Sequence, residues 1–355
     1  MSQHRVTTPH RRARRGVPSV MAQVLYALVP AILVHAWLFG WGIFIQLALA
    51  IGFALGFEGL MLRLRQRPVS VHLKDLSAVV AAVLFALSIP PLAPWWVAFV
   101  GMLFAIVIAK QLYGGIGFNL FNPAMVGFAA VIIAFPLALT QWVSPRTLVQ
   151  TVPDWHTTWT AIFKGQWPFN NTTDAISQAT PLDRLRSGLL DGQTLSEIQA
   201  DPLFGAFGSS GWEWLALAYL LGGLYLIQQR IITWHVPLAV LFGTLVLTLP
   251  GWLIDPDLFR SPLQQLAAGS LVMCAFFIAT DPVSGSSTPR GKIVFSIGVV
   301  VLTLAIRAWG GFPDGVAFAV LLMNMFVPLI DRYTTPRIFG HPTSKQLNTE
   351  QANKP

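Results

Sequence analysis

Charged residues are scarce in this chain. Only 11% of its 355 residues are Asp, Glu, Lys or Arg, whereas 54% are hydrophobic. A soluble globular protein carries about 25% charged residues, and a chain of this length with so few cannot coat a water-facing surface. The scarcity therefore excludes an ordinary soluble enzyme and indicates a protein whose outer surface meets lipid.

Cysteine is almost absent as well. The single Cys274 excludes an internal disulfide and any iron–sulfur cluster ligated wholly by this chain. No glycine-rich nucleotide-binding fingerprint is present. The net charge of +8 does not indicate nucleic acid, because the basic residues cluster at the N-terminus and at helix ends and form no basic face interleaved with aromatic side chains.

Long apolar runs are what the chain has instead. Each expected span approaches the roughly 20 residues that cross a bilayer as a helix, and tryptophans such as Trp142 and Trp214 lie near span ends, as interfacial belts require. The predicted fold is an all-α polytopic membrane protein of about ten transmembrane helices. We place these at 21–39, 41–62, 76–91, 95–113, 119–138, 213–229, 234–250, 263–280, 292–309 and 313–331.

Lys and Arg predict the orientation of these spans. With the N-terminus inside, the inside segments hold 17 of the 23 basic residues, the outside segments hold five, and Arg307 lies within a span. This excess follows the positive-inside rule. The basic start of the chain, before an unbroken series of spans, is typical of a cytoplasmic tail and not of a cleaved signal peptide. We therefore expect both termini in the cytoplasm.

This topology predicts five parts. They are a basic cytoplasmic tail (1–20), a first membrane half of five helices (21–138), a long outside segment (139–212), a second membrane half of five helices (213–331) and a cytoplasmic tail (332–355). An odd number of spans per half would invert the second half relative to the first, so a five-plus-five inverted repeat is one hypothesis. Asn122-Pro123 and Asp281-Pro282 are candidate points at which helices break.

Ionisable side chains within the predicted spans are few, namely Glu58, Lys110, Arg307 and Asp331. Each lies within about two turns of a span end, which favours snorkelling to polar surroundings. Glu58, the deepest acid, is the alternative candidate for an ion pathway. His35 is a lone histidine on its span, and packing is favoured over haem ligation, which needs two histidines at matched depth.

The string 174–183 (Asp-Ala-Ile-Ser-Gln-Ala-Thr-Pro-Leu-Asp) has two compatible interpretations. In the first, Thr180 caps a short helix that lies outside the membrane, with Pro181 and Asp183 completing a capping box. An apolar face of that helix is then formed by Leu182, Leu185 and Leu189. In the second, the string is the flavin-transferase acceptor pattern Asp-x-x-Ser-x-Ala-Thr, whose final hydroxyl takes FMN through its phosphate.

The two interpretations agree because a helix N-terminus favours a phosphate. Thr180 is then the site of a covalent FMN phosphoester. Asp174, Ser177 and Ala179 complete the acceptor motif. Two arginines one turn further on, Arg184 and Arg186, could offset the charge of Asp183.

Together with further strings, this segment resembles the D subunit of the Rnf ion-translocating oxidoreductase complex and, more distantly, the B subunit of the sodium-pumping NADH:quinone oxidoreductase. The other strings are Phe121-Asn122-Pro123-Ala124, Ala279-Thr280-Asp281-Pro282-Val283-Ser284, residues 310–324 and Pro328-Leu329-Ile330-Asp331. The resemblance implies FMN on Thr180, on the periplasmic side of a bacterial inner membrane, attached by a flavin transferase. Gln178 stands where many relatives have Gly. Relatives also imply a noncovalent riboflavin, which no residue here locates.

The resemblance further implies one subunit of a complex that couples NADH and ferredoxin redox chemistry to cation translocation. The chain has neither an NAD site nor cluster ligands, so we expect flavin and iron–sulfur subunits as partners, membrane lipid around them, and no turnover by this chain alone. A B-type subunit of the sodium-pumping enzyme is the nearest alternative. A solute channel or transporter without flavin, suggested by the repeat and broken helices, is an alternative of a different class.

Overall fold

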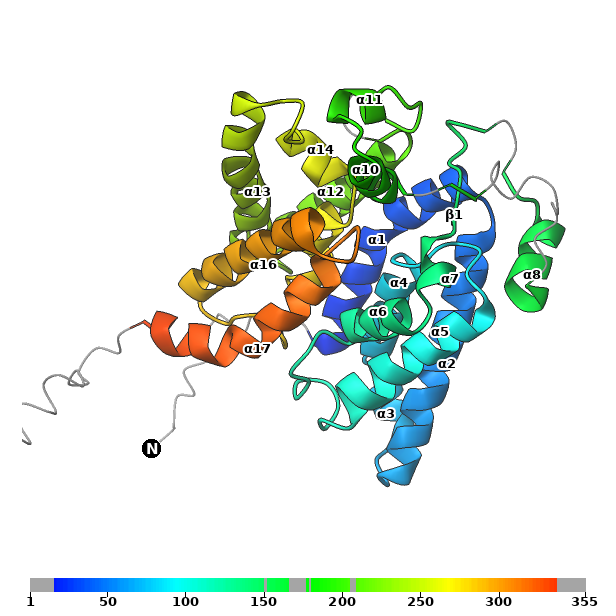
Figure 1. Cartoon of the computed structure of the whole chain (residues 1–355). Helices are drawn as coiled ribbons and strands as arrows, with labels where there is room; N and C mark the ends of the chain where they lie inside the picture. The colour runs from blue at the N-terminus through cyan, green and yellow to red at the C-terminus, as the bar shows by residue number, and fades with distance from the viewer. Residues whose placement is uncertain (1–15, 150–151, 166–176, 179, 205–208, 337–355) are drawn as a thin grey trace, which may run out of the picture.

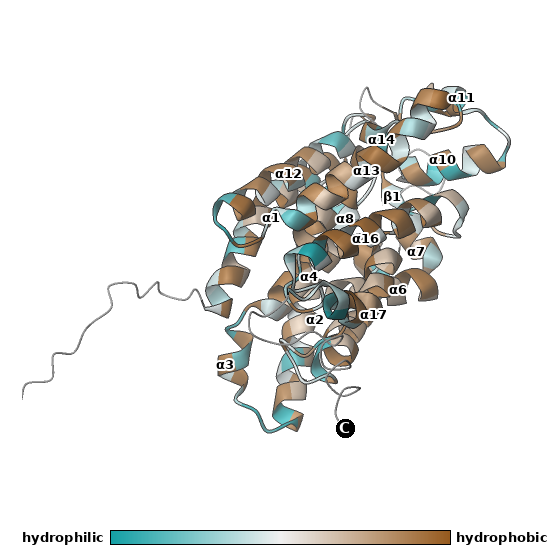
Figure 2. Ribbon diagram, turned by 90° about the vertical axis from the view of Figure 1, so that its left-hand side faces the viewer, coloured by the Kyte–Doolittle hydropathy of each residue, from teal (hydrophilic) through white to brown (hydrophobic). Residues whose placement is uncertain are grey.

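The computed structural model describes residues 16–149, 152–165, 177–178, 180–204 and 209–336. Five helices are long and apolar enough to cross a membrane. They are α1 (Val17–Phe39), α2 (Gly42–Leu64), α13 (His235–Ile254), α16 (Pro289–Trp309) and α17 (Val316–Thr334). Hydrophobic residues prevail along the helices of the bundle (Figure 2). The predicted all-α polytopic membrane fold is confirmed.

The other five predicted spans are helical but shorter or interrupted. One of them is α12 (Trp212–Gln228). The other four are α4 (Ser77–Ala86), α5 (Trp95–Met102) with its π-helical continuation η1 (Leu103–Gln111), α6 (Pro123–Ala134), and the series α14 (Pro262–Ala267), α15 (Leu271–Met273) and η2 (Cys274–Ile278). The expected span at 76–91 ends early because Pro90 and Pro91 cannot continue a helix and disfavour helical backbone before them.

The packing of the elements is similar in the two halves. In the first half α2 packs against α4 and α5, and η1 packs against α6; in the second half α13 packs against α14 and α16, and α16 packs against α17. In the part of the chain that the structure describes, the most extensive packing between the halves is that of α1 with α12, the first helix of each, and that of α6 with α17, the last helix of each. The order of helix packing thus repeats between the two parts, and the five-plus-five inverted repeat stays a prediction.

The segment between the halves folds into short elements. These elements are α7 (Pro136–Thr140), β1 (Trp142–Val143), α8 (Trp155–Lys164), β2 (Ser177–Gln178), α10 (Pro181–Leu190) and α11 (Leu195–Gln199). Of these, α10 and α11 lie at the end of the bundle opposite α3 (Val69–Leu73), while α7 and α8 lie along the side (Figure 1). β1 and β2 pair antiparallel, with Trp142 opposite Gln178. Most of both predicted terminal tails lies outside the described residues.

The snorkelling interpretation is wrong for Glu58 and Lys110. Both side chains are buried, and Lys110 Nζ lies 2.6 Å from Glu58 Oε1. Lys110 also donates to Ser77 Oγ at 2.7 Å, and Gln111 Nε2 donates to Glu58 Oε1 at 2.9 Å. The two spans therefore satisfy each other's charges inside the bundle, which is cheaper than leaving either charge unpaired in an apolar interior.

Snorkelling is also wrong for Arg307, which is buried and pairs with Asp314. Asp331 has a different role, because its carboxylate accepts hydrogen bonds from Ser286 and from the backbone N–H and hydroxyl of Ser287, just before α16 begins. Trp142 is not an interfacial belt residue either. Its indole is buried against Phe39 and Trp212.

Candidate functional site

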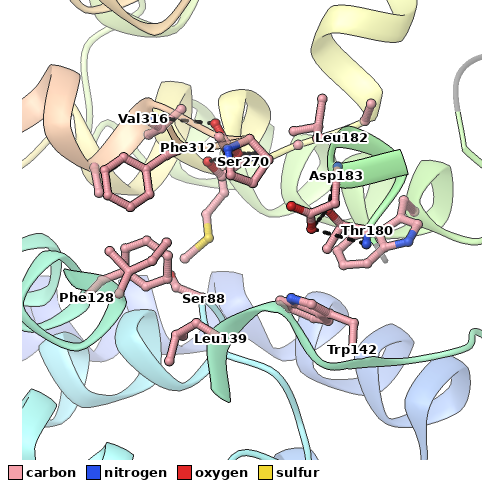
Figure 3. Close-up of a pocket in the computed structure, with 18 of the residues that line it drawn as sticks. Ser88, Phe128, Leu139, Trp142, Thr180, Leu182, Asp183, Ser270, Phe312 and Val316 are labelled. Carbon is pink, nitrogen blue, oxygen red and sulfur yellow. Dashed lines mark hydrogen bonds between the residues drawn. The ribbon is translucent and has the colours of Figure 1, made fainter. Parts of the chain in front are cut away.

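A cavity of about 330 Å³ lies between the two halves beneath α10. Its wall combines α1, α6, α7 and β1 with α12, the break between α14 and α15, and the turn before α17. Most of the lining is apolar or aromatic, with a few polar groups, which is the composition and the lower size range of pockets that bind small ligands and cofactors. Figure 3 shows Thr180, Asp183 and Ser270 facing the same space as Phe128, Trp142 and Phe312.

Thr180 lies on this wall at the start of α10. The predicted capping box is present: Asp183 N–H donates to Thr180 Oγ1 at 3.1 Å, and Thr180 N–H donates to Asp183 Oδ2 at 3.3 Å. The Thr180 hydroxyl also donates to Asp183 Oδ2 at 2.5 Å. The pairing of β1 with β2 holds the acceptor string beside Trp142, another cavity residue.

The other predicted motif residues are described only in part. Ser177 lies in β2, paired with Val143, while Asp174 and Ala179 fall outside the described residues. Within α10, Leu182 and Leu185 are buried as expected, but Leu189 is exposed. The apolar face of α10 is therefore shorter than the leucine spacing predicts, because the buried residue of its last turn is Gly188, which packs against Ile198 of α11.

The charges around Thr180 differ from the expectation in one respect. Burial raises the pKa of Asp183, and the hydrogen bonds from Thr180 and the nearby Arg186 act against that rise. Arg186 lines the cavity. Arg184 does not serve this carboxylate, since its guanidinium contacts Asp201 at 3.3 Å and Gln193 at 3.1 Å. The expectation that both arginines offset Asp183 is therefore right for Arg186 only.

A polar cluster closes the cavity on the side of the second half. Asp314 accepts hydrogen bonds from the backbone N–H and hydroxyl of Ser270 at 2.8 and 2.7 Å, and Arg307 donates to it at 3.2 Å. Gly269 permits this approach, because a Cβ there would lie 2.4 Å from Arg307 Nη2. The string 310–324 thus contributes cavity wall through its Gly311–Asp314 turn, in addition to packing.

His35 also lies on the cavity wall, which the sequence interpretation missed. Its side chain is buried, with its ring centroid 4.8 Å from that of Phe39 and 6.3 Å from that of Trp142. Neither ring nitrogen has a hydrogen-bond partner in the described part of the chain. The predicted topology contained a signal, because it places His35 near the outside end of its span, on the same side of the membrane as Thr180.

A second cavity, of about 190 Å³, lies near the opposite ends of α1 and α12. Two further strings of the resemblance, 121–124 and 279–284, meet there. Asn324 Oδ1 accepts from the Asn122 backbone N–H at 3.1 Å, and Asn324 Nδ2 donates to the Ser284 carbonyl at 2.9 Å. Asn122 and Asp281 line this cavity. Asn122-Pro123 is the N-cap and first residue of α6, and Asp281-Pro282 follows η2, so both predicted break points mark helix ends.

Comparison with known proteins agrees with the resemblance found in the sequence. The sequence model of the NQR2, RnfD, RnfE family matches residues 5–340. A protein of Alcanivorax borkumensis is 47% identical over 96% of this chain and 97% of its own length. A protein of Cronobacter sakazakii is 45% identical, and one of Vibrio cholerae serotype O1 is 46% identical. Each of these two matches covers 94% of this chain and 98% of the relative's own length. Each of the three is named as the D subunit of an ion-translocating oxidoreductase complex. With both lines of comparison covering nearly the whole sequence, this chain belongs to the NQR2, RnfD, RnfE family of membrane proteins.

Proposed function

We propose that this chain is the FMN-carrying membrane subunit of an ion-translocating oxidoreductase complex, with the flavin joined to Thr180 through its phosphate and its ring system in the cavity between the halves. One observation carries the proposal. The hydroxyl at the end of the acceptor string lies on the wall of a cavity lined mainly by apolar and aromatic side chains. The string and the cavity are independent features, and they meet at Thr180.

The residues around Thr180 suit a phosphoester. Leu182 supplies the first backbone N–H of α10, since Pro181 has none, and the amides of a first helical turn have no acceptor within their helix. Together with the positive end of the helix dipole they favour a negative group. Arg186, on the same wall, adds a positive charge. These groups together offset the charge that the ester phosphate brings beside Asp183.

Ester formation also changes the capping box. The Thr180 hydroxyl now donates to Asp183 Oδ2, and an ester oxygen has no hydrogen to donate. Asp183 then loses a donor and gains a negative neighbour, two changes that both favour its protonated form. Asp183 N–H can still donate to the ester oxygen and Thr180 N–H can still donate to Asp183 Oδ2, so that α10 keeps both contacts of its capping box and loses only the one made by the hydroxyl.

The cavity residues hold and screen the cofactor. Trp142, Phe128 and Phe312 supply aromatic surface for a planar ring system, and the cluster of Ser270 and Asp314 supplies polar groups at one wall. The bound flavin supplies the one-electron redox chemistry, while the protein supplies attachment, orientation and electrostatics. Exclusion of bulk water by these side chains keeps the reactive ring from unproductive partners.

Electrons must reach and leave this site through other subunits. The described residues contain no cluster of three or more His, Cys, Asp or Glu side chains that could hold a metal ion, and the chain has one cysteine. Partner subunits therefore carry the NADH-linked and ferredoxin-linked chemistry and the iron–sulfur clusters. The names of the relatives favour a D subunit over the B-type quinone reductase subunit. The isolated chain would bind flavin without turnover.

The second cavity is a suitable place for the noncovalent riboflavin that the resemblance implies. Its wall includes amide and hydroxyl side chains from both halves, among them Asn119, Asn122 and Thr280, beside apolar groups such as Phe276. A flavin without a phosphate needs hydrogen-bond partners for its ribityl hydroxyls and ring edge but no charged anchor. Asn122 is held in place by Asn324 and by the Ile278 carbonyl.

The proposed setting is a bacterial inner membrane, with both termini in the cytoplasm and Thr180 on the periplasmic side. The excess of Lys and Arg in the inside segments supports this orientation. The attachment reaction would then take place outside the cytoplasm, where a flavin transferase supplies FMN from a flavin dinucleotide and releases the adenylate half.

The test is a change of one hydroxyl. In Thr180→Val the shape is kept and the acceptor atom is lost, so the covalent flavin should disappear, seen as loss of the fluorescent band in a denaturing gel. Thr180→Ser, which keeps a hydroxyl, is the matched control and should retain the band. Loss of the cap costs only about 1 kcal/mol, so Thr180→Val should still accumulate in the membrane. A fluorescent band in Thr180→Val would refute attachment at this residue.

A further inference from the structure

The short helix α8 leaves a row of aromatic side chains uncovered. Trp155 and Trp159 are 52% and 44% exposed. The ring centroids of Trp155 and Trp159 lie 6.2 Å apart, and those of Trp159 and Phe163 lie 4.2 Å apart. Side chains four residues apart share one face of a helix, so these three rings form the aromatic face of α8. A contiguous group of exposed apolar side chains marks a surface that meets lipid, a ligand or another protein.

The rest of α8 divides into two further faces. One face is buried against the protein and consists of Thr158, Ala161 and Ile162. The other is polar and includes the exposed His156 and Lys164. At about 100° per residue, the aromatic face lies between these two. The helix therefore presents one face to the protein, one to water and a third that neither the protein nor water suits.

The aromatic face of α8 continues a surface of the membrane span α2. The ring of Trp155 lies 6.3 Å from that of Trp41, the N-cap of α2, and the ring of Trp41 lies 5.9 Å from that of Phe44. Trp41 and Phe44 are 53% and 40% exposed, at the start of a helix long and apolar enough to cross a membrane. Figure 1 shows α8 along the side of the bundle, next to α2, and not over its end. One row of rings thus runs from a span onto α8.

We infer that α8 is an interfacial helix whose aromatic face enters the lipid at the edge of the membrane, beside the start of α2. Tryptophan is enriched at this depth because its ring is apolar while its indole N–H can bond to headgroups and water. Lys164, on the polar face, can extend its ammonium group to the headgroups, as basic residues of interfacial helices do. The inference rests on the membrane fold and not on the proposed flavin.

Lipid suits this face better than a partner subunit does. The face carries no charged side chain, and its hydrogen-bonding groups are the two indole N–H groups of Trp155 and Trp159. It is also continuous with side chains that a span presents at its lipid-facing surface. Anchored in this way, α8 attaches the outside segment to the membrane between α7, near its start, and α12, where the chain re-enters the bundle.

The first test measures the surroundings of α8 in the purified full chain in lipid nanodiscs. Cys274 is the only cysteine and is buried, so a cysteine introduced on α8 can be spin-labelled selectively. Trp159→Cys places the label on the aromatic face, and Lys164→Cys, about 140° further round the helix, is the matched control. Oxygen concentrates in lipid and a nickel chelate in water. The ratio of the two accessibilities should be several-fold higher at position 159 than at position 164, and equal ratios would overturn the inference.

The second test distinguishes lipid from a partner subunit and uses the assembled complex. Trp159→Phe keeps an aromatic ring, and subtracting its emission from that of the unchanged complex isolates the fluorescence of Trp159. Lipid brominated near the headgroup end of its chains should quench this difference emission more strongly than lipid brominated near the chain ends, relative to unbrominated lipid. Difference emission that neither brominated lipid quenches would overturn the inference, whether protein or water covers the face. Because the substitution is conservative, this test also decides the case in which Trp159→Cys fails to accumulate.

Discussion

The buried pair of Glu58 and Lys110 allows a quantitative prediction. Replacing Lys110 by Met removes the ammonium group that lies 2.6 Å from Glu58 Oε1 and leaves the carboxylate with Gln111 as its donor. The side chains of Lys110 and Glu58 are only 3% and 2% exposed, so water cannot replace the lost partner. Removing one member of a buried ion pair costs about 3–5 kcal/mol, because the other charge is left uncompensated. Lys110→Met should therefore lower the free energy of unfolding by about that amount.

The double variant Glu58→Gln/Lys110→Met separates this explanation from loss of packing. It removes both charges while keeping similar volumes, and replacing both members of a buried pair is often close to neutral. The double variant should thus be more stable than Lys110→Met. The assay is denaturant unfolding in mixed micelles, with Lys164→Met, at the exposed end of α8, as the control for losing a lysine. Equal destabilisation in the single and double variants would refute the reasoning.

Three further predictions concern topology, partners and pH. A reporter fused near Gln193 should be active outside the cytoplasm and one fused after His341 only inside; cytoplasmic activity at Gln193 would contradict the span count. The purified chain, even with flavin attached, should not oxidise NADH, and measurable turnover would contradict the requirement for partners. Burial raises the pKa of Asp183 in the folded protein, so protonation of Asp183 stabilises α10 at low pH. This contribution to stability should fall as the pH rises through the pKa that Asp183 has in the folded protein. Hydrogen exchange of α10 in flavin-free protein should show this trend, and Asp183→Asn should remove it.

Much of the fold follows from sequence patterns that depend only on local chemistry. Apolar runs mark helices wherever the surroundings are lipid or core, and the Thr180-Pro181 pair marks a helix start because the capping box uses neighbouring residues. The interruptions of the third span in each half were harder to predict. The break at Gly269-Ser270 depends on Asp314, a residue 44 positions away that accepts the freed backbone hydrogen bond.

The candidate site was predictable to a similar degree. The acceptor string predicts Thr180 as the attachment residue because a transferase recognises a linear segment, and the structure places this residue on a cavity wall. The cavity was not predictable, because its wall combines residues from both halves whose proximity is a property of the packed fold. The same reason explains the errors on Glu58, Lys110 and Arg307: distance from a span end says nothing of a partner on another helix. Even Arg184 faces away from Asp183, since Asp201 and Gln193 bind its guanidinium.

The most direct test of covalent FMN on Thr180 is the mass of one peptide. Trypsin should release residues 165–184, which end at Arg184 and contain Thr180. In complex purified from cells that hold the flavin transferase, this peptide should be heavier by FMN less one water, and fragmentation should locate the added mass on Thr180. The same peptide at its unmodified mass, or with FMN on Ser177, Thr172 or Thr173, would contradict the account.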